Sequence, residues 1–172
     1  TGDWKIDPNP LIGGDIDQKK LKEIGDKGVI AMVCDSTNIF SEGRSGSELD
    51  VRESLLNIMS LKNKRIIVTS FASNVARMET IFYCAKKTGR DICLVGRSMH
   101  RIYKAAKKCG YMQNLIEPIE TREAKKTARN KIIFLCTGTQ GEPMGAMNRI
   151  INGIHPDVFL EAGDSVIFSS KI

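Results

Sequence analysis

Three segments of the sequence place small, hydroxyl and arginine residues directly after an apolar run and before a helical pattern. They read FASNVAR at 71–77, GRSM at 96–99 and TGTQGEPM at 137–144. Ligands of open α/β sheets bind at the carboxyl ends of the strands, and helix N-termini there offer N–H groups to phosphate oxygens. The spacing therefore predicts a phosphate-binding rim. The alternative is purely structural, because every helix needs a cap.

Some residues of this rim have predicted positions. Ser73 or Asn74, and Ser98, are predicted N-caps, and Pro143 suits a first helical position. Arg97 could add a bidentate contact to phosphate. The segments contain no nucleotide-binding motif, since no G-x-G-x-x-G follows a strand and GTQGEPMG lacks the lysine of a P-loop.

Two carboxylates near predicted strand ends form a second candidate site. Asp3 lies in TGD, and Asp35 follows the apolar run at 28–34. A carboxylate in such a position can ligate a divalent cation or orient a metal-ligating histidine. The alternative for each is a turn residue or helix cap. His100 and His155 are the only histidines and lie far apart, so no self-contained histidine metal cluster or Ser-His-Asp triad is available.

The elements that must position these residues alternate between strand and helix. Apolar runs without polar alternation predict buried strands of a parallel sheet at 28–34, 65–70, 91–95, 131–136 and 165–169, and residues 2–6 look like a strand end. Helical spacing predicts helices over 17–24, 49–61, 74–87, 99–109, 118–129 and 144–154, with Gly89 and Gly110 as C-terminal glycines. The predicted fold class is α/β: a doubly wound, mostly parallel sheet with helices on both faces.

The 172-residue sequence has an ordinary globular composition, with 41% hydrophobic and 27% charged residues. No apolar run approaches the roughly 20 residues that span a bilayer, so no membrane partner is expected. No Cys-x-x-Cys pair occurs, and the cysteines are predicted to be buried free thiols in a reducing cytosol. They are Cys34, Cys84, Cys93, Cys109 and Cys136. Both ends look interrupted, so we expect a piece of a larger intracellular enzyme; a small protein with trimmed tails is the alternative.

The net charge of +6 is concentrated in the middle of the sequence. Residues 62–131 hold 17 lysines and arginines against 5 acidic residues, whereas residues 1–61 carry a net −4 and residues 132–172 a net −2. A central block of +12 indicates a polyanionic partner. The alternative is that these lysines form solvated helix faces.

Several segments, taken in order, resemble one known family. They are TGDWKID at 1–7, GV at 28–29 followed by DSTN at 35–38, SE at 47–48, RIIVTSFASNVAR at 65–77, GRSM at 96–99, GY at 110–111 and GTQGEPM at 138–144. The combination covers essentially the whole chain. It is similar to the ribonuclease J family, a bacterial branch of the β-CASP group of metallo-β-lactamase-fold nucleases.

The resemblance implies an incomplete edge of a metallo-β-lactamase domain over residues 1–38 and a β-CASP domain over residues 39–172. It implies that RNA lies in the cleft between the two domains of the intact protein. It further implies a zinc-dependent ribonuclease, both 5′-to-3′ exonuclease and endonuclease, that acts in RNA maturation and decay. Two zinc ions, a cytoplasmic location and a homo-oligomer are implied for that intact protein.

The resemblance also implies roles for single residues. Asp3 matches the aspartate that bridges the two metals, and Asp35 matches the acidic residue that supports a catalytic histidine; both are therefore catalytic candidates. The RNA-binding candidates lie in the three rim loops and are Ser73, Asn74, Arg77, Gly96, Arg97, Ser98, Thr139 and Gln140.

The sequence departs from the family in its histidines. The HxHxDH metal motif and the later histidines are absent, and His100 and His155 match no catalytic position. Since zinc sites need three or more protein ligands, the chain by itself is expected to bind no zinc and to lack nuclease activity. Two other functions stay open: a flavodoxin-like module for a small phosphorylated ligand, and a structural or oligomerisation domain.

Overall fold

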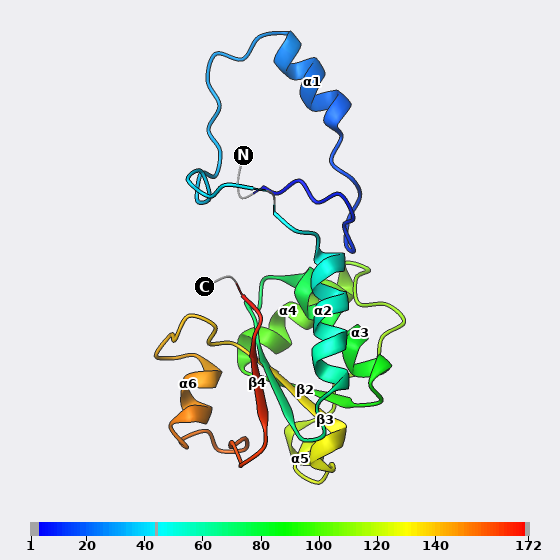
Figure 1. Cartoon of the computed structure of the whole chain (residues 1–172), viewed down its shortest axis with the longest axis vertical. Helices are drawn as coiled ribbons and strands as arrows, with labels where there is room; N and C mark the ends of the chain where they lie inside the picture. The colour runs from blue at the N-terminus through cyan, green and yellow to red at the C-terminus, as the bar shows by residue number, and fades with distance from the viewer. Residues whose placement is uncertain (1–3, 44, 171–172) are drawn as a thin grey trace. The chain divides into compact units, whose positions relative to one another are not determined.

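A computed structural model of the chain describes residues 4–43 and 45–170. It contains a sheet of four parallel strands in the order β2-β3-β1-β4 (Figure 1). The strands are β1 (Ile66–Thr69), β2 (Asp91–Val95), β3 (Ile132–Cys136) and β4 (Ser165–Phe168). Parallel strands need crossover connections, and helices supply them here, which confirms the predicted α/β class.

The strands form where the sequence is apolar on both faces. Every residue of β1 and β3 is buried, and so is β2 beyond Asp91. β3 lies between β1 and β2, with Leu135 opposite both Val68 and Leu94. Four of the predicted strands are confirmed to within one residue at either end.

The predicted strand at 28–34 is wrong. This segment forms neither helix nor strand, and Ile30, Met32 and Val33 are exposed. A strand depends on hydrogen bonds and side-chain pairs with a neighbouring strand, and the strands of the described residues, β1 to β4, pair only with one another. Of the strand end predicted at residues 2–6, residues 2 and 3 lie outside the described part of the chain, and residues 4–6 form no strand.

Four helices agree with the predicted ones. They are α1 (Gln18–Asp26), α2 (Glu48–Ser60), α3 (Val75–Lys87) and α4 (Arg97–Lys108). Shortly after α3 and α4 the chain reaches Gly89 and Gly110, whose φ angles of 62° and 86° are the left-handed conformation of helix C-terminal glycines. Both glycines are therefore confirmed as helix ends.

Two predicted helices are much shorter than expected. Within 118–129 the helix is limited to α5 (Thr121–Ala124), which the 3₁₀ turn η1 (Arg129–Lys131) follows, because this polar segment has little apolar surface to bury. The helix predicted over 144–154 is reduced to α6 (Ala146–Ile151). It starts late because Gly145 is extended, with ψ at 145°, and Pro143 therefore precedes the helix instead of opening it.

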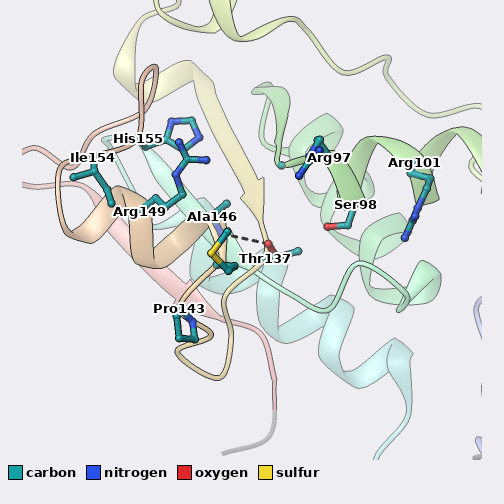
Figure 2. Close-up of a pocket in the computed structure, with 11 residues that line it drawn as sticks. Arg97, Ser98, Arg101, Thr137, Pro143, Ala146, Arg149, Ile154 and His155 are labelled. Carbon is teal, nitrogen blue, oxygen red and sulfur yellow. Dashed lines mark hydrogen bonds between the residues drawn. The ribbon is translucent and has the colours of Figure 1, made fainter.

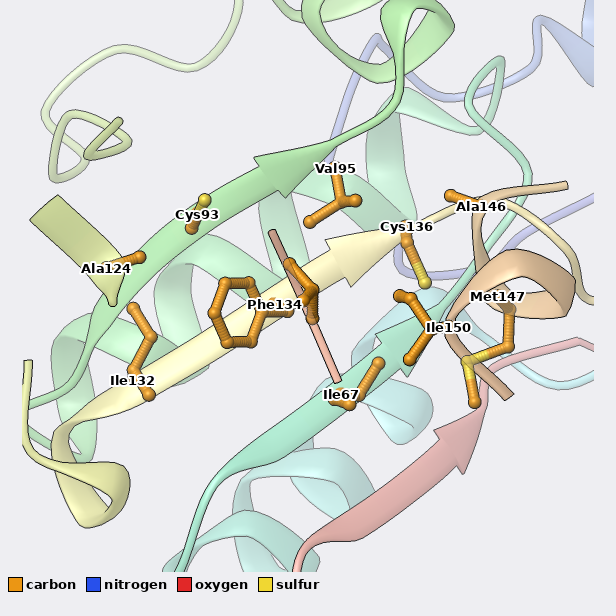
Figure 3. Close-up of a cluster of buried hydrophobic side chains, with 11 residues drawn as sticks. Ile67, Cys93, Val95, Ala124, Ile132, Phe134, Cys136, Ala146, Met147 and Ile150 are labelled. Atoms are coloured by element: carbon orange, nitrogen blue, oxygen red, sulfur yellow. The ribbon is translucent and has the colours of Figure 1, made fainter. Parts of the chain in front are cut away.

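One face of the sheet packs against the short helices α5 and α6 (Figure 3). Strand residues Ile67, Cys93 and Phe134 form a buried cluster there with Met147 and Ile150 of α6. Val95, Ala124, Ile132, Cys136, Ala146 and Val158 complete the cluster. α6 is thus held to the sheet by its apolar side.

The opposite face is covered by longer helices. Successive strand residues point to opposite faces, so Ile66, Ile92 and Ile133 point away from that cluster, and all three are buried. α3 and α4 both pack against β2, and the rings of Phe82 and Tyr103 on these helices stack with their centroids 5.3 Å apart. The sheet is therefore covered on both faces, as predicted.

The chain divides into two compact units, the first of which ends at Val51. In that unit the Asp7 carboxylate accepts the backbone N–H of Asn9 at 2.9 Å and of Glu48, the first residue of α2, at 3.0 Å. Burial raises the pKa of Asp7, but hydrogen bonds involving Ser47, Glu48 and Asn9 outweigh it and lower the pKa to about 2. Asp7 therefore stabilises the start of α2 as a carboxylate.

The predicted boundary between residues 38 and 39 separates two families of domain, whereas the two compact units are defined by contacts within the chain. The domain boundary therefore stays a prediction. Among the described residues, no helix combines the length and the apolar character that crossing a membrane requires.

Two neighbouring isoleucines of α6 test its packing. Ile150 is 1% exposed and Ile151 is 57% exposed. We expect Ile150→Ala to lower the free energy of unfolding by about 2–5 kcal/mol, because it leaves a cavity in the cluster. Ile151→Ala should change it by less than about 1 kcal/mol. Urea unfolding of both variants measures this difference, and equal losses would contradict the assignment of α6 to the core.

Candidate functional site

A pocket of about 820 Å³ opens at the carboxyl ends of β2 and β3 (Figure 2). One wall is the start of α4, and the other is formed by the loop after β3, by α6 and by the turn that follows it. The lining residues are Gly96, Arg97, Ser98, Arg101, Thr137, Pro143, Met144, Ala146, Arg149, Ile154 and His155. Two of the three loops of the predicted rim therefore enclose a cavity.

The loop after β3 approaches α6 very closely. The N–H of Met147 donates to the Thr137 carbonyl at 2.9 Å, and the N–H of Ala146 donates to Thr137 Oγ1 at 3.4 Å. Gly138 has φ at 114°, and a Cβ added there would lie 2.8 Å from Met147 Cβ. A Cβ added at Gly145 would lie 2.8 Å from Gly138 Cα. The two glycines thus let α6 sit directly on the end of β3.

α4 begins at the pocket without a side-chain cap. Its N-cap is Gly96, with φ at 104°, and the predicted N-cap Ser98 instead lies within the first turn, because the helix starts at Arg97. A Cβ at Gly96 would lie 3.7 Å from Ala146 Cβ and 3.9 Å from Thr137 Oγ1, so the loops after β2 and β3 meet here. Since no side chain caps α4, its first N–H groups can bind an anion.

Three arginines give the pocket a positive lining. Arg97 and Arg101 come from successive turns of α4 and Arg149 comes from α6, and all three are exposed. None of them forms an ion pair with a described carboxylate, and no lining residue is acidic. A concave surface with one sign of charge concentrates counter-ions, and the guanidinium fork matches phosphate. The pocket is therefore suited to a phosphate-bearing ligand.

His155 contributes a neutral group to the same wall. Its Nδ1 accepts the backbone N–H groups of Asp157 at 3.2 Å and Val158 at 3.1 Å, so the ring proton belongs on Nε2. Burial lowers the pKa of His155, Arg149 and Lys125 lower it further, and Asp157 acts in the opposite direction. At neutral pH His155 is therefore an uncharged hydrogen-bond donor.

The loop after β1 does not line the pocket. Asn74, not Ser73, caps α3, since its side chain accepts the N–H of Arg77 at 2.9 Å. The Arg77 guanidinium donates to the carbonyl of Ser169 at 3.0 Å and to its Oγ at 2.8 Å. Arg77 thus joins α3 to the residue after β4, while Ser73 and Asn74 are exposed.

The remaining predicted contacts lie in the loop after β3. The N–H of Gln140 donates to the Glu142 carboxylate at 3.1 Å, and the side chain of Gln140 is exposed. Thr139 Oγ1 is buried without a hydrogen-bond partner among the described residues. Neither Thr139 nor Gln140 lines the pocket. Of the predicted RNA contacts, only Gly96, Arg97 and Ser98 line it.

The two predicted catalytic carboxylates have different outcomes. Asp3 lies outside the described residues. Asp35 is a turn residue, whose carboxylate accepts from Thr37 Oγ1 and from the Thr37 N–H at 3.0 Å. Both hydrogen bonds lower the pKa of Asp35, and the bond from the Thr37 hydroxyl has the larger effect. Within the described residues no three histidine, cysteine or carboxylate side chains gather as metal ligands, so that part of the chain does not fit a zinc site.

The cysteines also lie outside the pocket, and all five are free thiols. Cys84, Cys93 and Cys136 are buried as predicted, whereas Cys34 is half-buried and Cys109 is exposed. Burial raises the pKa of Cys84 and Cys93 to about 11 and that of Cys136 to about 12. These three are core residues rather than nucleophiles.

Three residues of the pocket, Arg101, Arg149 and His155, were not predicted as site residues from the sequence. Arg101 lies one helical turn after Arg97, a spacing that was available in the sequence. Arg149 is on the outer side of the predicted helix 144–154, and nothing in that pattern indicates which exposed residue faces a cavity. His155 carried no signal, because its place depends on the turn that follows the short α6.

Comparison with known proteins decides the family. Residues 63–172 match the family profile described as "Ribonuclease J, beta-CASP domain". This range includes the whole sheet and every residue that lines the pocket. The chain belongs to the ribonuclease J β-CASP family.

Curated relatives carry the same family name. The Ribonuclease J of Sinorhizobium meliloti is 39% identical over 171 residues, which are 99% of this chain and 30% of that protein. The Ribonuclease J of Synechocystis is 40% identical over 174 residues, 99% of this chain and 27% of that protein. Ribonuclease J 1 of Streptococcus pyogenes is 40% identical over 175 residues, 99% and 30% respectively. The chain thus spans less than a third of these relatives.

Substitutions at two glycines of the loop after β3 can distinguish the cost of backbone strain from the cost of a steric clash. Gly138 and Gly141 both have positive φ, 114° and 72°, but a Cβ meets Met147 only at Gly138. We expect Gly138→Ala to destabilise the chain by at least about 1 kcal/mol more than Gly141→Ala, because only the first displaces α6. Thermal unfolding compares the two variants. A cost at Gly141 as large as that at Gly138 would show that the close approach is unimportant.

Acid should weaken the fold through His155. The pKa of His155 in the folded chain lies below the ordinary histidine value of 6.5. Below about pH 6.5 the unfolded chain therefore binds more protons than the folded one, and stability falls as the pH drops. We expect urea midpoints to fall more from about pH 7 to about pH 5 in the wild type than in His155→Gln, which cannot titrate. Identical pH profiles of the two proteins would refute this role.

Proposed function

We propose that this chain is the RNA-binding part of a zinc-dependent ribonuclease, which acts as a 5′-to-3′ exonuclease and as an endonuclease in RNA maturation and decay. The observation that carries the proposal is the arginine-lined pocket at the carboxyl edge of the β-CASP sheet. RNA presents a phosphate at every nucleotide, and basic grooves bind single strands through these phosphates. The name Ribonuclease J of the relatives supports RNA as the ligand.

Within the pocket, the proposed contacts follow from the chemistry of each group. Arg97 would pair with a phosphate through its guanidinium fork, and Gly96 and Ser98 would place the uncapped start of α4 against phosphate oxygens. Further along the rim, the proposed flanking contacts are Ser73, Asn74, Arg77, Thr139 and Gln140. Because Arg77 already donates to Ser169, its proposed role is to hold the loop after β1 in place.

The hydrolytic chemistry would belong mainly to the rest of the longer protein. We propose residues 1–38 as the edge of a metallo-β-lactamase domain and residues 39–172 as the β-CASP domain. Asp3 is the proposed bridging ligand of two zinc ions, and Asp35 is the proposed partner of a catalytic histidine. Paired metals supply an activated water and stabilise the attacking and leaving oxygens. The residues of this chain would bind and orient the RNA, and the chain alone would be inactive.

Two further features of the whole protein are proposals. The buried thiols of Cys84, Cys93 and Cys136 suit a reducing compartment, which supports the cytoplasm as the location. A homo-oligomer is proposed from the family resemblance.

The pocket also keeps a second candidate ligand. Its volume of about 820 Å³ lies within the range of small-molecule sites, roughly 300–1,000 Å³. A small phosphorylated ligand, as in a flavodoxin-like module, would therefore fit. Membership of the ribonuclease J family favours RNA, and the dependence of affinity on RNA length separates the two candidates.

The proposal is tested with two fluorescently labelled, 5′-phosphorylated oligoribonucleotides, a shorter one of about 2 nucleotides and a longer one of about 12. Arg97→Ala with Arg149→Ala should weaken binding of both on the order of tenfold near 0.1 M salt and reduce the salt slope by about 1.4, since each lost phosphate contact removes about 0.7. Fluorescence anisotropy over a salt series measures both quantities.

The control is Lys62→Ala with Lys64→Ala, two exposed residues before β1 that remove the same charge. Its affinity should stay close to that of the wild type. The proposal fails if the pocket variant binds as the control does. Affinity that is equal for both oligonucleotides would favour the small phosphorylated ligand.

A further inference from the structure

The outer face of α4 carries a row of four basic residues that extends beyond the pocket. Arg97, Arg101, Lys104 and Lys108 are all exposed, at spacings of four, three and four residues. At 3.6 residues per turn these positions fall within an arc of about 60° on one side of the helix. They lie opposite the buried side of α4, which is formed by Met99, Tyr103 and Ala106. We call these four residues the basic row.

The basic row is continuous with the pocket. Arg97 and Arg101 both line it, and Figure 2 shows them on the turns of α4 that form one wall. Lys104 and Lys108 continue the row along the same helix, about 16 Å in total at 1.5 Å per residue. Neighbouring members are about 5–6 Å apart, a spacing close to that of successive phosphates in an extended single strand.

No acidic residue neutralises the basic row on its own helix, because the sequence RSMHRIYKAAKK contains none. Lys107, which lies outside the row, pairs with Glu117. Other lysines of the basic segment are engaged as well, Lys86 with the Asn114 carbonyl at 3.0 Å and Lys125 with Asp157 at 2.7 Å. No side-chain partner of the four row residues occurs among the described residues. Their charge is therefore available to a ligand.

We propose that the basic row is a track for the backbone of single-stranded RNA, which leads along α4 into or out of the pocket. The inference rests on the proposed function of the pocket and adds a second surface to it. Lys104 and Lys108 contact phosphates of nucleotides that lie outside the pocket. The contacts are electrostatic and read no bases, because lysine meets phosphate as a point charge.

The track makes a prediction about RNA length that the pocket alone does not. Lys104→Ala with Lys108→Ala should leave binding of the oligoribonucleotide of about 2 nucleotides unchanged, since its two phosphates, about as far apart as neighbouring members of the row, reach no further than Arg97 and Arg101. Binding of the oligoribonucleotide of about 12 nucleotides should weaken on the order of tenfold near 0.1 M salt, with a salt slope reduced by about 1.4. Anisotropy titrations of the 172-residue chain measure both.

Two comparisons make the outcome decisive. Lys62→Ala with Lys64→Ala removes the same charge elsewhere and should bind both RNAs as the wild type does. Lys104→Arg with Lys108→Arg should restore the affinity for the longer RNA, because the charge is kept. The track is refuted if the alanine variant binds the longer RNA like the control, or if it loses the shorter RNA equally. Failure of the pocket itself shows separately, as unchanged binding of the shorter RNA in the Arg97→Ala, Arg149→Ala variant.

Discussion

The pocket depends on the parallel pairing of β3 with both of its neighbours. β3 is buried along its whole length and is hydrogen-bonded to β1 on one side and β2 on the other. Because parallel strands run in one direction, the loops that follow them reach the same edge of the sheet. Gly96 and Thr137, 41 residues apart in sequence, therefore meet at the pocket floor, where a Cβ on the glycine would lie 3.9 Å from the threonine hydroxyl. Without this pairing, the two arginine-bearing helices would have no common cavity.

The sheet was predictable from the sequence because its strands are apolar on both faces. Runs such as IIVT in β1 and IIFLC in β3 are apolar over most of their length, so neither face of the strand suits contact with water. This pattern predicts burial between two layers of helices. The run at 28–34 has the same character and yet forms no strand. The composition of a segment shows that it would be stable when other residues bury it. It does not show whether a neighbouring strand is available to pair with it.

The candidate site was predictable only in part, for a related reason. Gly96, Arg97 and Ser98 could be located because they directly follow β2, and the strand end determines where they lie. Arg149 and His155 come from the short α6 and the turn behind it, whose positions depend on the close approach of Gly138 and Gly145. Such a contact is invisible in a sequence, since most glycines in turns serve only the backbone conformation.

The basic residues of the chain have two roles, which the net charge does not distinguish. Some form ion pairs that stabilise the fold, and others face the pocket. Arg65, which precedes β1, and Arg129, which opens η1, both pair with Asp164, whose side chain is 1% exposed. The two pairs join the start of β1 and the turn before β3 to the turn before β4. Arg52 pairs with Glu79 and connects α2 to α3. These arginines belong to the architecture. The arginines of the pocket have no such partners among the described residues, which is why their charge can act on a ligand.

The two sides of α4 have almost nothing in common physically. Met99, Tyr103 and Ala106 are buried and hold the helix to the sheet, while Arg97, Arg101, Lys104 and Lys108 on the outer side are exposed. Substitutions on the outer side therefore cost little folding free energy. An evolving lineage, or a protein engineer, could raise or lower the charge of this helix almost freely and so adjust how tightly and how selectively the surface holds its ligand. The fold leaves that property open to selection at nearly constant stability.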